Sequence, residues 1–158
     1  IMKAYCTRVG AGPFPTELFD ETGAEIRQLG HEYGAVTGRE RRCGWIDLVA
    51  LRYSIMVNGV TKLIMMKSDV LDTFDTIKAC VAYERDGKRM EDFPYNIEDG
   101  ITPIYTEMKG WKTDMTKITS EEQFPEEFKN YIKFLEEQLE TPIAIISIGP
   151  DREQTIIR

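Results

Sequence analysis

Three arginines lie close together in the segment Gly34–Trp45. Arg39, Arg41 and Arg42 fall within four positions of one another, with a glycine on each side of the group. Guanidinium groups stay charged and bind carboxylate and phosphate groups as planar forks. Glycines allow the backbone to turn and to approach a ligand closely. Because the chain carries a formal net charge of −7, a basic loop in it indicates a local site for anions. A solvated surface loop is the alternative.

Lys67 and Asp69 follow a short apolar run, Leu63–Met66, which has the pattern of a strand covered on both faces. Open α/β proteins bind ligands at the carboxyl ends of their strands. A carboxylate there can accept two parallel hydrogen bonds from N1–H and the 2-amino group of guanine, a donor pair that adenine lacks. The lysine stem can lie along the purine plane. A solvated strand end is the alternative, since Lys-x-Asp is a common triplet.

A second apolar strand, Pro142–Ile146, is followed by Ser147-Ile148-Gly149-Pro150. The backbone amides and the serine hydroxyl of this segment can bind a purine O6 or a ribose. A plain exit from the strand into a turn is the alternative. If the two strands are neighbours, their loops form two walls of one pocket for a base.

Several kinds of chemistry are excluded by what the sequence lacks. His31 is the single histidine, and it falls in a segment expected to be helical, which argues against a zinc site or a Ser-His-Asp triad. Neither a Gly-x-x-x-x-Gly-Lys-Ser/Thr loop nor a Gly-x-Gly-x-x-Gly motif occurs. The excess of 27 acidic over 20 basic residues argues against nucleic-acid binding.

Size and composition indicate one folded domain. The 158 residues can bury a core, and 42% apolar with 30% charged residues argues against disorder. The apolar runs are too short to span a membrane. Cys6, Cys43 and Cys80 contain no Cys-x-x-Cys pair, which predicts thiols in a reducing cytosol. No secretory signal is visible, and Ile1 opens directly on a strand, which suggests a piece of a longer polypeptide.

The elements that must position these residues are of mixed type. Helices are expected where apolar residues recur at helical spacing, over Asp20–Tyr33 (stripe Ile26, Leu29, Tyr33), Asp47–Val57 (buried on most faces) and Phe124–Glu140 (stripe Phe128, Tyr131, Ile132, Leu135, Leu139). Strands are expected over Met2–Val9, Thr61–Met66, Ile77–Glu84, Ile104–Tyr105 and Pro142–Ile146. Turns are predicted at Gly10–Pro15 and Asp86-Gly87, and a polar surface excursion at Arg89–Gly100.

Four of these segments together resemble adenylosuccinate synthetase. In that enzyme's order they are Thr7–Glu17, Gly38–Trp45, Lys67–Asp72 and Ser147–Arg152, with Pro103–Tyr105 and Gly110-Trp111 matching between them. The resemblance runs from near Lys3 to the last residue and corresponds to the C-terminal portion of the enzyme. It implies an α/β fold: the C-terminal part of a P-loop-NTPase-like mixed, largely parallel sheet with flanking helices and antiparallel hairpin insertions.

The resemblance also implies an activity. The family joins IMP and L-aspartate to give adenylosuccinate while GTP becomes GDP and phosphate, a step of AMP biosynthesis. The γ-phosphate is thought to pass to the 6-oxygen of IMP, from which the aspartate amine displaces it. The family implies GTP as co-substrate, Mg²⁺ for the whole enzyme, a homodimer and a cytoplasmic location. Neither nucleic acid nor membrane is expected as a partner.

Roles for individual residues follow from the same resemblance. The loop that closes over aspartate corresponds to Ala35, Val36, Thr37, Gly38, Arg39, Glu40 and Arg41. IMP contacts correspond to the backbone of Val9 and to Arg39, and Arg41 also lies near the GTP phosphate. Guanine recognition corresponds to Lys67, Ser68, Asp69, Ser147, Ile148 and Gly149. The chain departs from the pattern at Glu40 and Cys43, where relatives often have Arg and Thr.

The family's phosphate loop, catalytic Asp and His, and magnesium ligands belong to an N-terminal part that does not match this stretch. We therefore expect no catalytic residue and no metal ligand within residues 1–158, and no turnover from this stretch alone; His31 does not match the catalytic histidine. The alternative is a non-catalytic purine-nucleotide-binding or regulatory module. A third hypothesis is an interaction domain whose loops are inert.

Overall fold

The structure is a computed structural model that describes residues 1–97 and 100–158. The chain divides into two compact units, each built from separate parts of the sequence. The first unit comprises Ile1–Ala4, Ser54–Ile77 and Glu107–Arg158, and the second comprises Tyr5–Tyr53 and Lys78–Thr106. Within the described residues, no helix has the length and apolar character needed to cross a membrane.

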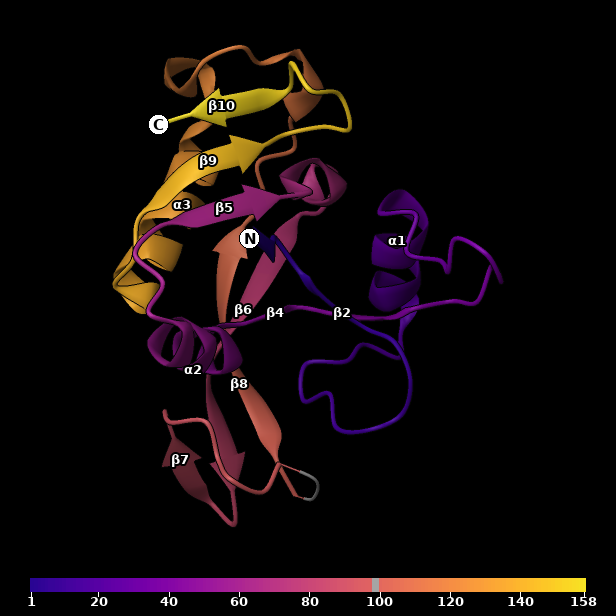
Figure 1. The fold of residues 1–158 in the computed structure, drawn as a ribbon, viewed down its shortest axis with the longest axis vertical. Coiled ribbons are helices and arrows are strands. Elements are labelled where there is room, and N and C mark those ends of the chain that lie inside the picture. The colour runs from indigo at the N-terminus through magenta and orange to yellow at the C-terminus, as the bar shows by residue number, and fades with distance from the viewer. Residues whose placement is uncertain (98–99) are drawn as a thin grey trace. The chain divides into compact units, whose positions relative to one another are not determined.

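The first unit contains a sheet of four strands in the order β1 (Met2–Lys3), β5 (Leu63–Met66), β9 (Ile143–Ser147) and β10 (Thr155–Ile157) (Figure 1). β1, β5 and β9 run parallel, and β10 is antiparallel to β9. The predicted strands at Thr61–Met66 and Pro142–Ile146 are therefore confirmed as direct neighbours. Their carboxyl ends meet at the same edge of the sheet.

Helix α3 (Glu126–Leu139) belongs to the same unit, and the helix predicted there is confirmed. The five residues of the predicted stripe are all at most 3% exposed: Phe128, Tyr131, Ile132, Leu135 and Leu139. The Tyr131 hydroxyl donates to the carbonyl oxygen of Ala4 over 3.1 Å. The Glu136 carboxylate, also on α3, accepts from the Ile143 amide at the start of β9. Short 3-10 helices η1 (Ser68–Leu71), η2 (Met115–Lys117) and η3 (Glu121–Gln123) complete the unit.

The second unit pairs β2 (Cys6–Arg8) with β3 (Arg42–Gly44) in antiparallel fashion, and helix α1 (Glu21–Leu29) belongs to it. A second sheet joins β4 (Ile46–Asp47), β6 (Thr76–Arg85), β7 (Lys88–Met90) and β8 (Thr102–Lys109). The predicted turn between β6 and β7 is confirmed, since Asp86 and Gly87 have φ of 52° and 73°, both positive as in a type I′ hairpin. Helix α2 (Leu48–Asn58) follows β4 directly.

The predicted strand Met2–Val9 is interrupted. Ala4 and Tyr5 are almost completely buried but lie outside the strands, and β1 and β2 pair with different partners, β5 and β3. Part of the reason is that the Ala4 carbonyl accepts from the Tyr131 hydroxyl rather than from a neighbouring strand. Side-chain alternation along the sequence could not reveal this break.

The first helix ends four residues earlier than predicted. Asp20 caps the helix, because its carboxylate accepts from the Gly23 amide over 3.2 Å. The helix stops at Leu29, and His31 takes a left-handed backbone with φ of 50°. Of the predicted stripe only Ile26 is buried; Leu29 is 42% exposed and Tyr33 38%. His31 therefore lies beyond the helix.

Two other predictions of burial were wrong in part. Helix α2 buries Leu48 and Val49, whereas Met56 is 69% and Val57 61% exposed. In β5 the exposed fraction of Met66 is 38%, so that strand is not fully covered on both faces. Continuous apolar sequence does not tell which face is covered. β8 extends well beyond the predicted Ile104–Tyr105, and part of the predicted excursion Arg89–Gly100, at residues 98–99, lies outside the described residues.

A buried carboxylate joins β4, β6 and α2 in the second unit. Asp47 is 6% exposed and Tyr83 is fully buried, and the Tyr83 hydroxyl donates to Asp47 Oδ2 over 2.5 Å. The Ala50 amide donates to Asp47 Oδ1 at the start of α2. Desolvation raises the pKa of Asp47, although the hydrogen bond from Tyr83 opposes that shift. The pair thus anchors the first turn of α2 to the sheet.

The substitution Tyr83→Phe should lower the free energy of unfolding by about 1–3 kcal/mol, because it leaves a buried carboxylate without one of its donors. Urea denaturation measures the change. Tyr53→Phe is the matched control, since the Tyr53 side chain is partly exposed on α2. Equal stability of the two variants would contradict the anchoring role of Asp47.

Candidate functional site

The first unit brings the two predicted base loops together. The loops that follow β5 and β9 lie at adjacent ends of parallel strands, and the Ser68 hydroxyl donates to the Ser147 carbonyl oxygen over 3.1 Å. Ser68 is fully buried. Its side chain therefore ties one loop to the other instead of facing a ligand. The juxtaposition of Lys67–Asp69 with Ser147–Gly149 is confirmed, and their role in guanine binding stays a prediction.

Lys67 marks the sharp turn from β5 into η1. Its backbone has φ of 61°, a left-handed conformation that is uncommon for a residue with a side chain. Such conformations gather at functional sites, where the surrounding structure maintains them. Asp69 follows within η1, half-buried. Desolvation raises the pKa of Asp69, and the nearby charge of Lys67 acts in the opposite direction.

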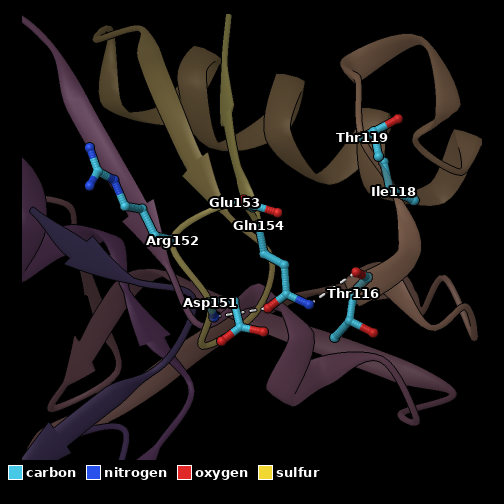
Figure 2. Close-up of a pocket in the computed structure, with 7 residues that line it drawn as sticks. All are labelled: Thr116, Ile118, Thr119, Asp151, Arg152, Glu153 and Gln154. Atoms are coloured by element: carbon cyan, nitrogen blue, oxygen red, sulfur yellow. Dashed lines mark hydrogen bonds between the residues drawn. The ribbon is translucent and has the colours of Figure 1, made fainter.

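The loop after β9 is held by its own backbone and by Gln154. The Ser147 hydroxyl donates to the Gly149 carbonyl over 3.1 Å, and the Ile148 amide donates to the Gln154 carbonyl over 2.9 Å. A Cβ atom on Gly149 would lie 2.1 Å from Gln154 Oε1, so a side chain at this position would displace the Gln154 amide from its present place. The Gln154 side chain accepts from the Asp151 amide and donates to the Thr116 carbonyl, each over 3.0 Å (Figure 2). The sequence alone did not single out Gln154.

This loop also forms one side of an open hollow of about 540 Å³ in the first unit. In Figure 2 the Arg152 side chain points away from Gln154 and Thr116. The hollow is lined by Thr116, Ile118, Thr119, Asp151, Arg152, Glu153 and Gln154. Its rim is thus polar and carries both signs of charge.

Asp72, the last residue of the Lys67–Asp72 motif, binds the segment that follows β8. Trp111 donates from its indole Nε1 to Asp72 Oδ1 over 2.6 Å, and the Met115 amide donates to Asp72 Oδ2 over 2.8 Å. Desolvation raises the pKa of Asp72 to about 6, these two hydrogen bonds oppose the shift, and the negative charges of Asp69 and Asp114 add to it. The segment Gly110-Trp111, which is part of the family resemblance, is thereby joined to the loop that follows β5.

The second unit carries the arginine loop as a hairpin over residues 33–40. Tyr33 and Glu40 form an antiparallel bridge, the Gly34 amide donates to the Arg39 carbonyl over 2.8 Å, and Gly38 supplies a positive φ of 64°. The predicted closing loop, Ala35–Arg41, thus contains the tip and the returning arm. Its tip residue Val36 is 98% exposed. Nothing packs the tip in place among the described residues, as a loop that moves over a substrate requires.

A small cavity of about 110 Å³ lies between this hairpin and the loop that follows β2. It brings together Val9 and Arg39, which the resemblance assigned to IMP, and Arg41, which it assigned to aspartate and the GTP phosphate. The remaining lining residues are Arg8, Gly10, Gly34, Thr37, Glu40 and Arg42. Four arginines and a single acidic residue, Glu40, are therefore among the residues that line this cavity. Arg8 belongs to the segment Thr7–Glu17, and no sequence pattern indicated that it would line the same cavity.

The arginines of this cavity differ in their partners. Arg42 forms a bidentate pair with Glu17, donates to the carbonyls of Gly10 and Gly12, and lies 5.5 Å above the Phe14 ring. The Arg42 guanidinium therefore stabilises the glycine-rich turn after β2.

Arg41 donates from Nη1 to Glu32 Oε2 over 2.8 Å. In the described part of the chain, the Arg39 side chain makes no hydrogen bond or ion pair, which leaves its guanidinium open to an anion. Arg39 is therefore the most available of the three to bind an anion, Arg41 is less available, and Arg42 is the least available.

A metal site is not formed by these residues. Among residues 1–97 and 100–158, no cluster of three or more His, Cys, Asp or Glu side chains is arranged to hold a metal ion.

The fold defines an α/β protein with mixed parallel and antiparallel sheets and a P-loop-like architecture. The family model for adenylosuccinate synthetase matches residues 1–156. The chain belongs to the adenylosuccinate synthetase family, a family of enzymes of the IMP–aspartate ligase type.

Individual relatives support this assignment. The chain is 77% identical over 158 residues to the adenylosuccinate synthetase of Phocaeicola vulgatus and 72% identical to that of Parabacteroides distasonis. Each match covers 100% of this chain and 37% of the relative, so the chain spans little more than a third of their length. That this third is the C-terminal portion stays a prediction.

A solved structure is also similar. The fully ligated adenylosuccinate synthetase from Plasmodium falciparum superposes with a TM-score of 0.94 at 38% sequence identity, covering 99% of this chain and 38% of that chain. The predicted α/β fold class is confirmed by this match.

Trp111 should report the titration of Asp72. In a Trp45→Phe variant, which leaves Trp111 as the only tryptophan, fluorescence should change with a midpoint at about pH 6. Because the folded-state pKa lies above the ordinary value of 3.8, the folded state binds the proton more tightly, so unfolding should become easier as pH rises from 3.8 to about 6. Adding Asp72→Asn should abolish the midpoint; its persistence would assign the titration to another group.

Proposed function

We propose that this chain supplies the guanine-recognition loops and the substrate-anion loop of a GTP-dependent ligase that joins IMP and L-aspartate to give adenylosuccinate, GDP and phosphate. The observation that carries the proposal is the convergence of Val9, Arg39 and Arg41 on one cavity, in a chain whose net charge is −7. Membership of the adenylosuccinate synthetase family sets the substrate class.

The arginine cavity suits the charges of this reaction. Aspartate brings two carboxylates, IMP brings a phosphate, and the transferred phosphoryl group is also anionic. Guanidinium forks stabilise such groups best where water is partly excluded. Arg39 binds a substrate carboxylate and IMP, Arg41 lies between the aspartate carboxylates and the GTP phosphate, and the exposed backbone of Val9 contacts IMP. The loop Ala35–Arg41, whose tip at Val36 is exposed, closes over aspartate.

The base loops suit a guanine. The Asp69 carboxylate accepts from N1–H and the 2-amino group, the Lys67 stem lies along the purine plane, and the 147–149 backbone faces the other edge of the base. The direct hydrogen bond from Ser68 to Ser147 supports this arrangement, since it holds the two walls at a fixed spacing. GTP is thus the co-substrate, with its base on this chain.

Other parts of the reaction belong to the rest of the polypeptide. Magnesium neutralises phosphate charge when it is bound in such enzymes, and in this proposal its ligands belong to the rest of the polypeptide. The complete protein acts in the cytoplasm as a homodimer. Proximity of the reacting groups and their acid–base chemistry require the missing portion.

The 158-residue chain by itself should show no turnover with IMP, GTP and L-aspartate, because the proposed phosphate-transfer centre is not part of it. A phosphate-release assay on the purified chain measures this, with the complete polypeptide as positive control. Sustained release of phosphate that depends on both IMP and aspartate would contradict the division of labour proposed here.

Asp69→Ala in the complete polypeptide should weaken GDP binding about ten- to hundredfold, as expected for losing two hydrogen bonds to a charged acceptor. Binding of ADP should stay unchanged. Calorimetry with GDP and ADP measures both, and Asp75→Ala, a substitution at an exposed aspartate six positions away, is the matched control. A parallel loss of GDP and ADP affinity would show that Asp69 supports the fold rather than reading the base.

A further inference from the structure

We propose that Glu32 is a positioning residue for Arg41: its buried carboxylate fixes the guanidinium of Arg41 in the orientation in which it meets the substrate anion. The inference rests on the proposed function, because it assumes that Arg41 holds a substrate group. Glu32 lies outside every segment that the sequence marked as functional, and it is separated from Arg41 by the whole hairpin.

The Glu32 carboxylate is removed from water and has a donor at each oxygen. The Glu32 side chain is fully buried. Its Oε2 accepts from Arg41 Nη1 over 2.8 Å, and its Oε1 accepts from the Tyr5 hydroxyl over 2.6 Å. Tyr5 is itself 2% exposed. A buried carboxylate is strongly unfavourable unless it is paired and hydrogen-bonded, so this arrangement binds Arg41 firmly to one place.

The backbone also holds the pair. The Glu32 amide donates to the Arg27 carbonyl, and the Arg41 amide donates to the Glu32 carbonyl, each over 2.9 Å. The Arg27 side chain donates from Nε to the Arg41 carbonyl over 2.9 Å. Glu32 and Arg41 are therefore joined through both main chain and side chain at the base of the hairpin, whereas the tip at Val36 is exposed.

The geometry leaves part of the Arg41 guanidinium for a ligand. Nη1 is directed to Glu32, while the side chain as a whole is 34% exposed and lines the cavity with Val9 and Arg39. Arg41 Nε is buried and has no hydrogen-bond partner among the described residues. A buried donor without an acceptor is unfavourable; what the cavity offers to an anion is the exposed part of the Arg41 side chain.

Positioning of this kind acts through orientation. A guanidinium that is fixed before the substrate arrives loses little entropy on binding and keeps its fork aligned with the anion. Without the Glu32 charge, Arg41 would keep its own charge but could rotate away from the cavity. The Tyr5 hydroxyl supports the same arrangement from the other side of the carboxylate.

The test uses the complete polypeptide and steady-state kinetics. Glu32→Gln, which keeps the shape and removes the charge, should lower kcat/KM for L-aspartate about ten- to hundredfold. Tyr5→Phe should have a smaller effect, because the contact with Arg41 remains. Glu21→Gln, at an exposed glutamate in the first turn of α1, is the matched control and should equal the unmodified protein. Thermal unfolding of each variant confirms that it is folded.

A double-mutant cycle separates positioning from general structural support. Glu32→Gln is repeated in an Arg41→Met background, with single-turnover rates measured at excess enzyme so that slow variants stay measurable. If Glu32 acts through Arg41, it should add less than a twofold loss there. The same loss in both backgrounds would overturn the positioning role of Glu32 and leave the proposed function intact. A normal rate for Glu32→Gln where Arg41→Met is impaired would do the same.

Two further outcomes are informative. Normal kinetics in Arg41→Met itself would overturn the proposed role of the arginine loop, and the positioning role with it. If Glu32→Gln does not fold, Glu32→Asp takes its place: it keeps the charge but withdraws it by one methylene, so it should lower kcat/KM only while Arg41 is present. A loss that is independent of Arg41 would again overturn the inference.

Discussion

Carboxylates that have been removed from water organise the parts of this protein that matter for function. Glu32 is fully buried and fixes Arg41, Asp47 is 6% exposed and joins the start of α2 to Tyr83, and the half-buried Asp72 holds Trp111. Each is stable only because donors surround it. Since the donors come from distant parts of the sequence, each carboxylate joins elements that have no local reason to lie together. Glu32 holds the base of the arginine loop in this way, and Asp72 holds the loop that follows β5.

Much of the fold could be predicted from residue patterns alone. The apolar stripe of α3 and the Asp-Gly turn after β6 were correct because their signals are local and strong. The condition on which the two base loops would meet, that their strands are neighbours, is fulfilled because β5 and β9 pair in parallel. The break between β1 and β2 could not be predicted, since it depends on a hydroxyl 127 positions away in the chain. The exposure of Met56 and Val57 on α2 could not be predicted, because these residues are as apolar as the buried Leu48 and Val49.

The arginine loop shows the same limit at the level of a site. Charge and spacing indicated an anion site, and the resemblance separated Arg39 and Arg41 from Arg42. What the sequence could not supply is the reason for the difference. Arg42 pairs with Glu17 and two carbonyls, and Arg41 with a carboxylate nine residues earlier. Neither partner is marked by a motif. Arg8 entered the cavity only through the folding of the turn after β2.

The central claim is that one polypeptide holds a guanine on the loops after β5 and β9 and an anionic substrate on the arginine cavity. A crystal structure of the complete polypeptide with GDP and IMP tests it most directly. The account predicts the guanine N1 and 2-amino group within hydrogen-bond distance of the Asp69 carboxylate, and IMP in contact with Val9 and Arg39. A guanine bound elsewhere, with Asp69 facing solvent and the arginine cavity empty, would contradict it.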